Sequence, residues 1–240
     1  MIRNGSYAVA CILAAGFAFA SPCAVAASLE IAPVLVDVPA PGAAGIVNLR
    51  NAGTTPLNAQ VRVFRWTQTH GVDLYDATGA VVASPPLLTM PPGSTYALRV
   101  VRVSTAPIDG EESYRVVIDE LPDPTHATSG VRLALRYLVP AFFEPATFGP
   151  PKLTWTYSKS GGALKLTARN DGGRRVRISA LVLRDARGHV ARFGGGLAGY
   201  ALAHSSVTFV ARGKVTGFAG GAATVDAMGD LGKLHAVARP

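Results

Sequence analysis

Short apolar runs rich in β-branched and aromatic residues recur along this chain, and clusters of turn residues separate them. Such runs are typical of β-strands, and the Gly, Pro and Asn residues between them supply the backbone conformations at which a chain reverses. No long amphipathic helical pattern competes with them. The pattern therefore predicts an all-β fold. The expected strands lie in GIVNLRN, NAQVRVFRWTQ, STYALRVVRVS, EESYRVVIDEL, KLTWTYS, ALKLTARN, RVRISALVLRD and SSVTFVAR.

The first 26 residues have the features of a secretory signal peptide. Arg3 precedes an apolar run at positions 7–20, and A-V-A at positions 24–26 fits the small-residue rule for cleavage. The run is shorter than the roughly 20 residues that a membrane-spanning helix needs. Pro22 directly before Cys23 is a poor fit to a lipoprotein site. We therefore expect a signal peptide at 1–26, an exported protein and no stable membrane insertion.

Both cysteines, Cys11 and Cys23, fall inside this segment. The remaining chain of about 214 residues must then fold without disulfides, although its destination is oxidising. Thiolate metal sites and cysteine nucleophiles are excluded for it. Its length is enough for a sizeable core in one or two domains.

A step in charge divides the chain at the proline-rich segment FEPATFGPPK. Residues 27–145 contain 8 Arg, no Lys and 11 acidic residues, a net charge of −3, whereas residues 146–240 carry 14 basic and 4 acidic residues, a net charge of +10. This predicts an N-terminal domain at 27–145 and a C-terminal domain at 146–240, each an immunoglobulin-like β-sandwich. The basic residues are spread among strand residues without interleaved aromatics, which argues against nucleic acid. We expect Trp66 and Trp155 in the cores, one per domain.

The segment VRLALRYLVPAFFEP, residues 131–145, alternates like a strand and ends at a proline-bounded corner. Arg132 and Arg136 lie on one of its faces. At a sheet edge, such a strand is a template for pairing with another chain. Periodicity alone also fits an apolar row that faces the core of its own domain. That row consists of Val131, Leu133, Leu135, Tyr137 and Val139.

Nearly the whole chain after the signal resembles a periplasmic pilus chaperone of the chaperone–usher pathway. The motifs occur in the family's order: SLEIAPVLVDV, an opening strand, then VNLRNAGTTPLNAQVRVFRWTQ, ASPPLLTMPPGSTYALRVVRV, EESYRVVIDELPDP and VRLALRYLVPAFFEP. Arg136-Tyr137 followed by Pro140 and Phe142 is most similar to the archaic branch, which serves spore-coat-protein-like pili. The resemblance implies two immunoglobulin-like sandwiches in an L-shaped arrangement.

The resemblance also implies a function without catalysis. Pilus subunits of this pathway are sandwiches that lack their last strand, and the chaperone lends them one before an outer-membrane usher receives them. The partners are then pilus subunits and the usher, and a free chaperone can self-associate through its exposed strand. The lent residues would be Val131, Leu133 and Leu135, with Tyr137 and Val139 continuing the row.

One family feature is missing from this sequence. In the family, an Arg of the first strand and a Lys of the strand before the hinge bind the subunit's terminal carboxylate. Here Leu35 stands where the Arg is expected and Pro140 where the Lys is expected. An arginine elsewhere could take over, because its planar fork binds carboxylate with two hydrogen bonds. Arg136 is the first candidate, and Arg115 and Arg102 are the next.

Catalytic motifs are absent from the sequence. The five histidines are scattered without metal-ligand spacing, and there is no nucleophile elbow or phosphate-binding loop. We therefore expect no enzyme activity, no cofactor and no metal. The alternative function is that of a secreted immunoglobulin-like adhesive or structural module.

Overall fold

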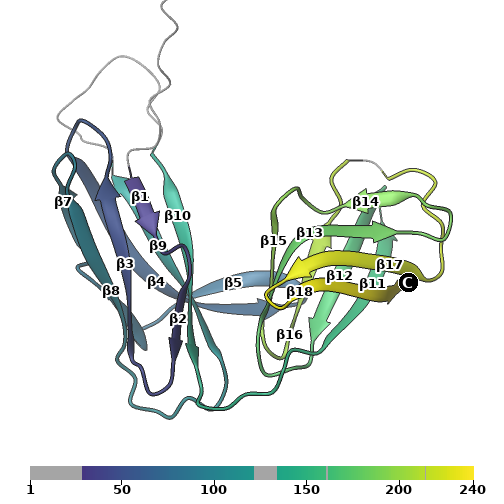
Figure 1. Ribbon diagram of the computed structural model, residues 1–240, viewed down its shortest axis with the longest axis horizontal. Helices are drawn as coiled ribbons and strands as arrows, with labels where there is room; N and C mark the ends of the chain where they lie inside the picture. The colour runs from purple at the N-terminus through teal and green to yellow at the C-terminus, as the bar shows by residue number, and fades with distance from the viewer. Residues whose placement is uncertain (1–28, 122–133, 161, 214) are drawn as a thin grey trace, which may run out of the picture.

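The computed structural model describes residues 29–121, 134–160, 162–213 and 215–240. In these ranges the chain forms β-strands and no helix, so no helix there is long and apolar enough to cross a membrane. The prediction of an all-β fold is confirmed. Figure 1 shows two sandwiches side by side, with their strands inclined to one another; the L-shaped arrangement stays a prediction.

Two sheets form the N-terminal sandwich. One has the order β1-β3-β8-β6, and the other β2-β10-β9-β4-β5 with β7 also paired to β4. Their facing side chains, among them Val47, Leu98 and Ile118, make one core. The strands are β1 (Leu29–Ala32), β2 (Val36–Pro39), β3 (Ala44–Asn51), β4 (Leu57–Thr69), β5 (Val72–Ala77), β6 (Val81–Ser84), β7 (Leu87–Met90), β8 (Thr95–Arg102), β9 (Glu112–Leu121) and β10 (Arg136–Glu144).

The second sandwich has a core of its own, to which Trp155, Leu166 and Ile178 belong. Hydrogen bonds join its strands in the order β14-β13-β17-β18-β11-β12-β16, and β15 pairs with β13. No strand is described between Glu144 and Leu153, where the hinge is expected. The strands are β11 (Leu153–Ser160), β12 (Ala163–Asn170), β13 (Val176–Arg184), β14 (Val190–Arg192), β15 (Leu197–Ala201), β16 (Ser205–Val210), β17 (Ala223–Gly229) and β18 (Gly232–Arg239).

The opening segment differs from the single strand that the sequence suggested. It forms β1 and β2, which belong to different sheets, with a break at Pro33. A proline lacks the N–H that a continuing ladder needs, which accounts for an interruption at this point. The segment therefore closes both sheets, pairing with β3 through β1 and with β10 through β2.

The expectation that Trp66 lies in a domain core was wrong. Trp66 is buried, but it packs with Phe142 of its own domain and with Tyr200 and Leu202 of the second domain. The alternation along β4 is the reason. Because even-numbered residues of β4 point away from the N-terminal core, Trp66 faces outward and is covered by the other domain.

The end of β4 and the turn that follows it add backbone and amide contacts across this interface. The side-chain amide of Gln68 donates to the carbonyl of Tyr200 (2.7 Å) and accepts from the N–H of Leu202 (3.0 Å). The carbonyl of Gly71 accepts from the N–H of Thr208 (2.9 Å), at the tip of the β4–β5 hairpin that reaches toward the second domain in Figure 1. Gly71 has a φ of 81°, and a Cβ there would come within 2.2 Å of the Thr208 hydroxyl oxygen. This hairpin needs a glycine at its tip.

A buried ion cluster between the domains is centred on Arg175, which precedes β13. Its buried guanidinium pairs with Glu111 (2.5 Å), Glu144 (3.0 Å) and Asp37, all from the N-terminal domain. It also lies 3.7 Å from the ring centroid of Phe142. Burial raises the pKa of Glu111, although the charge and hydrogen bonds of Arg175 oppose this effect. Neither strand periodicity nor a motif predicted this interaction.

Replacing Arg175 with Ala leaves these carboxylates without their shared cation, two of them nearly inaccessible to solvent. We expect the free energy of unfolding to fall by about 3–5 kcal/mol, the usual cost of breaking a buried ion pair. Urea unfolding of the purified protein measures it. The matched control is Arg174→Ala, whose side chain is 39% exposed and whose loss should cost about 0–1 kcal/mol. Equal unfolding midpoints for the two variants would contradict this role.

Candidate functional site

The outer face of the N-terminal sheet carries side chains in rows that run across β4, β9 and β10. The registers place Arg62, Val117 and Leu138 in one row. Further rows lie on either side: one contains Gln60, Asp119 and Arg136, and the other contains Phe64, Arg115 and Pro140. The row of Phe64, Arg115 and Pro140 is the one nearer the domain interface, because Trp66 and Phe142 follow it along their strands.

Half of β10 has a free edge. Beyond β9, its other neighbour β2 pairs only with residues 141–144, so residues 136–140 have no partner strand on that side among the described residues. The carbonyl of Leu135 accepts from the N–H of Glu120 (2.9 Å). In an antiparallel pair the hydrogen-bonding direction alternates, so Arg136 and Leu138 turn their backbone groups to the free edge. Pro140, which has no N–H, ends this available stretch.

The five predicted strand residues have different positions. Val131 and Leu133 lie outside the described residues. Leu135 is half-buried, directly before β10. Val139 is 4% exposed within the N-terminal core, and Tyr137 packs against that core. Side chains at these last two positions therefore face their own sandwich.

Tyr137 is further fixed by its hydroxyl group. It donates to the carbonyl of Leu29 (3.1 Å) and lies 3.3 Å from Glu120 Oε1. Burial, together with the charge of Glu120, raises the pKa of Tyr137 to about 12. Tyr137 thus stays neutral and ties the first part of β10 to β1.

The three candidate arginines do not come together. Arg102 is buried and forms two hydrogen bonds of 2.9 Å with Glu112, on the core side of the sheet. Arg136 is 62% exposed on the outer face, at the start of β10. It lies four residues before Pro140, about 13 Å at the usual rise of a strand. Arg115, directly opposite Pro140 on β9, is the candidate that reaches the domain interface.

Arg115 lies in an aromatic setting between the domains. Its guanidinium carbon is 3.7 Å from the ring centroid of Trp66 and 5.7 Å from that of Tyr200. Its Nε and the Trp66 Nε1 are buried polar atoms without a hydrogen-bond partner in the described part of the chain. Leu35, at the position where the resemblance places an Arg, packs against the same cluster. Buried donors without a partner are uncommon in folded proteins, and these two lie together at the junction of the domains.

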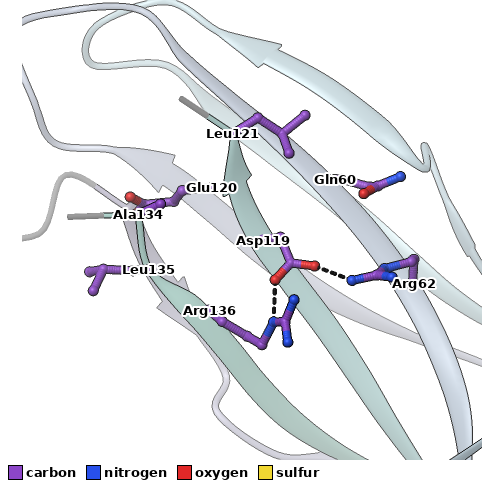
Figure 2. A pocket seen from close by; sticks show the side chains of 8 residues that line it. All are labelled: Gln60, Arg62, Asp119, Glu120, Leu121, Ala134, Leu135 and Arg136. Atoms are coloured by element: carbon purple, nitrogen blue, oxygen red, sulfur yellow. Dashed lines mark hydrogen bonds and ion pairs between the residues drawn. The ribbon is translucent and has the colours of Figure 1, made fainter. Parts of the chain in front are cut away.

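Asp119 connects three strands at the opposite end of the outer face. It accepts from Arg62 Nη2 (2.6 Å) and Arg136 Nε (2.5 Å), which approach it from β4 and β10 in Figure 2. Burial by itself would raise the pKa of Asp119, but the hydrogen bonds and charges of the two arginines hold it below its usual value. Asp119 therefore stays ionised at neutral pH.

The Asp119 shift predicts a pH dependence. A carboxyl group whose folded-state pKa is depressed contributes stability above its unfolded value, here 3.8, and this is lost as the pH falls through the folded value. We expect Asp119→Asn to lower the free energy of unfolding by about 1 kcal/mol at pH 7 and to remove this acid-dependent loss. Urea titrations at pH 7 and pH 3 measure both effects.

The control for Asp119→Asn is Glu30→Gln. Glu30 pairs with Arg50 at the surface, where both side chains are about half exposed, so its loss should change little. If Asp119→Asn lost as much stability between pH 7 and pH 3 as the unmodified protein, the predicted ion cluster would be wrong.

Across the described ranges, no group of three His, Cys, Asp or Glu side chains is placed to hold a metal ion. The features that meet on the outer face and at its border are an edge of β10 without a partner strand in the described part of the chain, exposed apolar side chains and arginines. These suit the binding of another polypeptide.

Comparison with known proteins supports this reading. The sequence model for pili and flagellar-assembly chaperones, PapD N-terminal domain, matches residues 28–149, just over half of the chain. An uncharacterised fimbrial chaperone of Escherichia coli strain K12, YcbF, is 27% identical over 114 residues. That alignment spans 44% of this chain and about half of the relative, 47% of its length.

Solved structures of chaperones share the fold over both domains. The crystal structure of the CsuC–CsuE chaperone–tip subunit pre-assembly complex, from archaic Csu pili of Acinetobacter baumannii, matches with a TM-score of 0.69 and 26% identity, covering 89% of this chain and 99% of that one. A complex of the Salmonella enterica SafA pilin with the SafB chaperone matches with a TM-score of 0.60 and 18% identity over 88% and 96% of the chains. The prediction of two sandwich domains of the pilus-chaperone type is confirmed, and the chain belongs to the family of pili and flagellar-assembly chaperones.

Proposed function

We propose that this protein is a periplasmic chaperone of the chaperone–usher pathway, which holds pilus subunits by lending them a strand and passes them to an outer-membrane usher. The observation that carries the proposal is the free edge of β10. An apolar row precedes that edge in the sequence, and family membership adds independent support. The similarity to a Csu complex favours the archaic branch.

In this proposal the backbone of the lent strand supplies hydrogen bonds to the subunit, and its side chains supply apolar contacts. The backbone groups of Arg136 and Leu138 continue a ladder into the partner, and Pro140 ends it. Val131, Leu133 and Leu135 enter the subunit's groove, each contributing about 1.5–3 kcal/mol of apolar burial before association costs. Tyr137 and Val139, which pack on the chaperone's own core, instead hold the base of the lent strand in place.

We assign the terminal carboxylate of the subunit to Arg115. Arg102 is committed to Glu112, and Arg136 lies away from the domain interface. Arg115 stands opposite Pro140, where the family resemblance places a Lys, and it has an unsatisfied Nε among aromatic rings. Partial burial strengthens a charge-assisted bond there relative to one in water.

Release requires no nucleotide in this scheme. A strand held by an edge ladder and a few apolar anchors can be displaced stepwise by a competing strand of the next subunit at the usher. In the absence of a subunit, the same edge can pair with a second chaperone copy.

We place the domain boundary at residues 145–146, between the described strands β10 and β11.

The donor strand is tested by co-expressing the tagged chain with the small secreted proteins encoded beside it and purifying complexes from the periplasm. We expect a one-to-one complex with the cognate subunit, which Leu133→Asp or Leu135→Asp abolishes because a carboxylate cannot be buried in an apolar groove. The control is Leu231→Asp, at a leucine that is 87% exposed in the second domain. If the Leu133 and Leu135 variants retained the subunit as the control does, the proposed function would be wrong.

The anchor is tested by Arg115→Ala in the same complex. We expect at least a tenfold higher Kd, because removing one partner of a desolvated charge pair typically costs about 2–5 kcal/mol. The control is Arg99→Ala, an exposed arginine on β8 in the other sheet. Isothermal titration with the purified subunit gives both values. Unchanged affinity for the Arg115 variant would rule out the anchor but leave the donor strand standing.

A further inference from the structure

We propose that Arg62 and Arg136, which we call the outer arginine pair, form a second carboxylate-binding site for an acidic side chain on the bound subunit. The inference rests on the proposed function and extends it, since this site is separate from the terminal-carboxylate anchor. It lies at the start of β10, four strand positions from the row of Arg115. Figure 2 shows both arginines on the same face of the sheet, with Asp119 between them.

Hydrogen-bond capacity is the first argument. A guanidinium group has five N–H donors. The described contacts of Arg136 use its Nε, and those of Arg62 use its Nη2, both toward Asp119. The terminal nitrogens of Arg136 and the remaining nitrogens of Arg62 can therefore donate hydrogen bonds to a further carboxylate. Asp119 lies between the two guanidinium groups and holds both in position through these hydrogen bonds.

Exposure and space are the second argument. The side chains of Arg136 and Arg62 are 62% and 44% exposed, whereas Asp119 between them is only 13% exposed. They border an open cavity of about 420 Å³, which Gln60, Leu135 and Glu120 also line. The carboxylate of Glu120 is held by the Tyr137 hydroxyl, at 3.3 Å. A glutamate or aspartate side chain fits such a volume, and the amide of Gln60 offers a further donor.

Position is the third argument, and it identifies the occupant. Arg136 is the first residue of β10, at the beginning of the unpaired edge. The next row toward the domain interface holds Leu138, which is 51% exposed, beside Val117. Along this edge, a pairing strand therefore lies first beside the charge of Arg136 and then beside the apolar side chain of Leu138. The partner that fits is the subunit's edge strand, with an acidic residue followed by an apolar one.

Charge pairing at this exposed site would guide association and register more than it would add to total affinity. Acidic side chains on the subunit are drawn to the outer arginine pair, which aligns the partner strand before the apolar anchors enter their groove. This predicts an association rate that falls with salt. Arg62→Gln combined with Arg136→Gln should lower the association rate by about tenfold at low salt and remove most of its salt dependence.

The experiment measures stopped-flow association of the purified subunit with the full chaperone at 20–500 mM NaCl. Four proteins are compared: the unmodified chain, the double Gln variant, the double variant Arg62→Lys and Arg136→Lys, and the control Arg50→Gln on the opposite sheet. The Lys variant keeps the charge and should retain the salt dependence. Thermal unfolding of each free protein separates this role from the structural one of Asp119.

The outcomes separate the two hypotheses. If the unmodified chain binds and the double Gln variant, folded, associates at the same rate with the same salt dependence, the second site is overturned and the chaperone function stands. If the Lys variant behaves as the Gln variant does, electrostatic guidance is overturned. If the unmodified chain binds no subunit, both the proposed function and this site are overturned.

Discussion

The buried guanidinium of Arg175 is the contact on which the rest of the arrangement depends. Its carboxylate partners lie on β2, at the end of β10 and directly before β9. One cation from the second domain therefore ties together the ends of three neighbouring strands of the binding sheet. Phe142 beneath it continues into the aromatic cluster with Trp66 and Tyr200. The approach of Tyr200 to Arg115 belongs to the same junction.

Strand β10 serves two purposes along its length. Its last residues are covered by β2 on one side and by β9 on the other, and their side chains are buried. Its first residues keep β9 but have no described neighbour at the other edge. The domain can therefore remain folded while it presents backbone groups to a partner. An edge strand of this kind is normally a hazard, and here proline limits its length.

Much of the fold could be predicted from the sequence because strand alternation is a local property. It accounts for Val61 in the core of the first domain and for Arg62, Phe64 and Trp66 on the other face of β4. It could not show that a second domain covers Trp66, since that contact joins residues far apart in the chain. The proline break between β1 and β2 was visible in the sequence, but the change of sheet was not.

The candidate site was predictable to a smaller extent. Residue types indicated arginine as the carboxylate anchor. Which acidic residue each arginine contacts in the folded chain depends on strand pairing, and the alternation of residues along one strand does not reveal that pairing. Arg102 is taken by Glu112, ten residues away, and Arg175 by Glu111, which is 64 residues away. Strand register distinguishes Arg115 from the other two candidate arginines, because it places Arg115 opposite Pro140. That pairing is a property of the register between β9 and β10, which alternation along either strand does not reveal.

The contact between Arg115 and Trp66 also gives the molecule an optical property. The chain has two tryptophans, and the other one, Trp155, lies in the core of the second sandwich. A cation above an indole ring alters the energy of its excited state, so any acceptor that draws the guanidinium away changes the emission of Trp66 while that of Trp155 stays constant. The protein thus contains its own fluorescent reporter and internal reference at the junction of its domains.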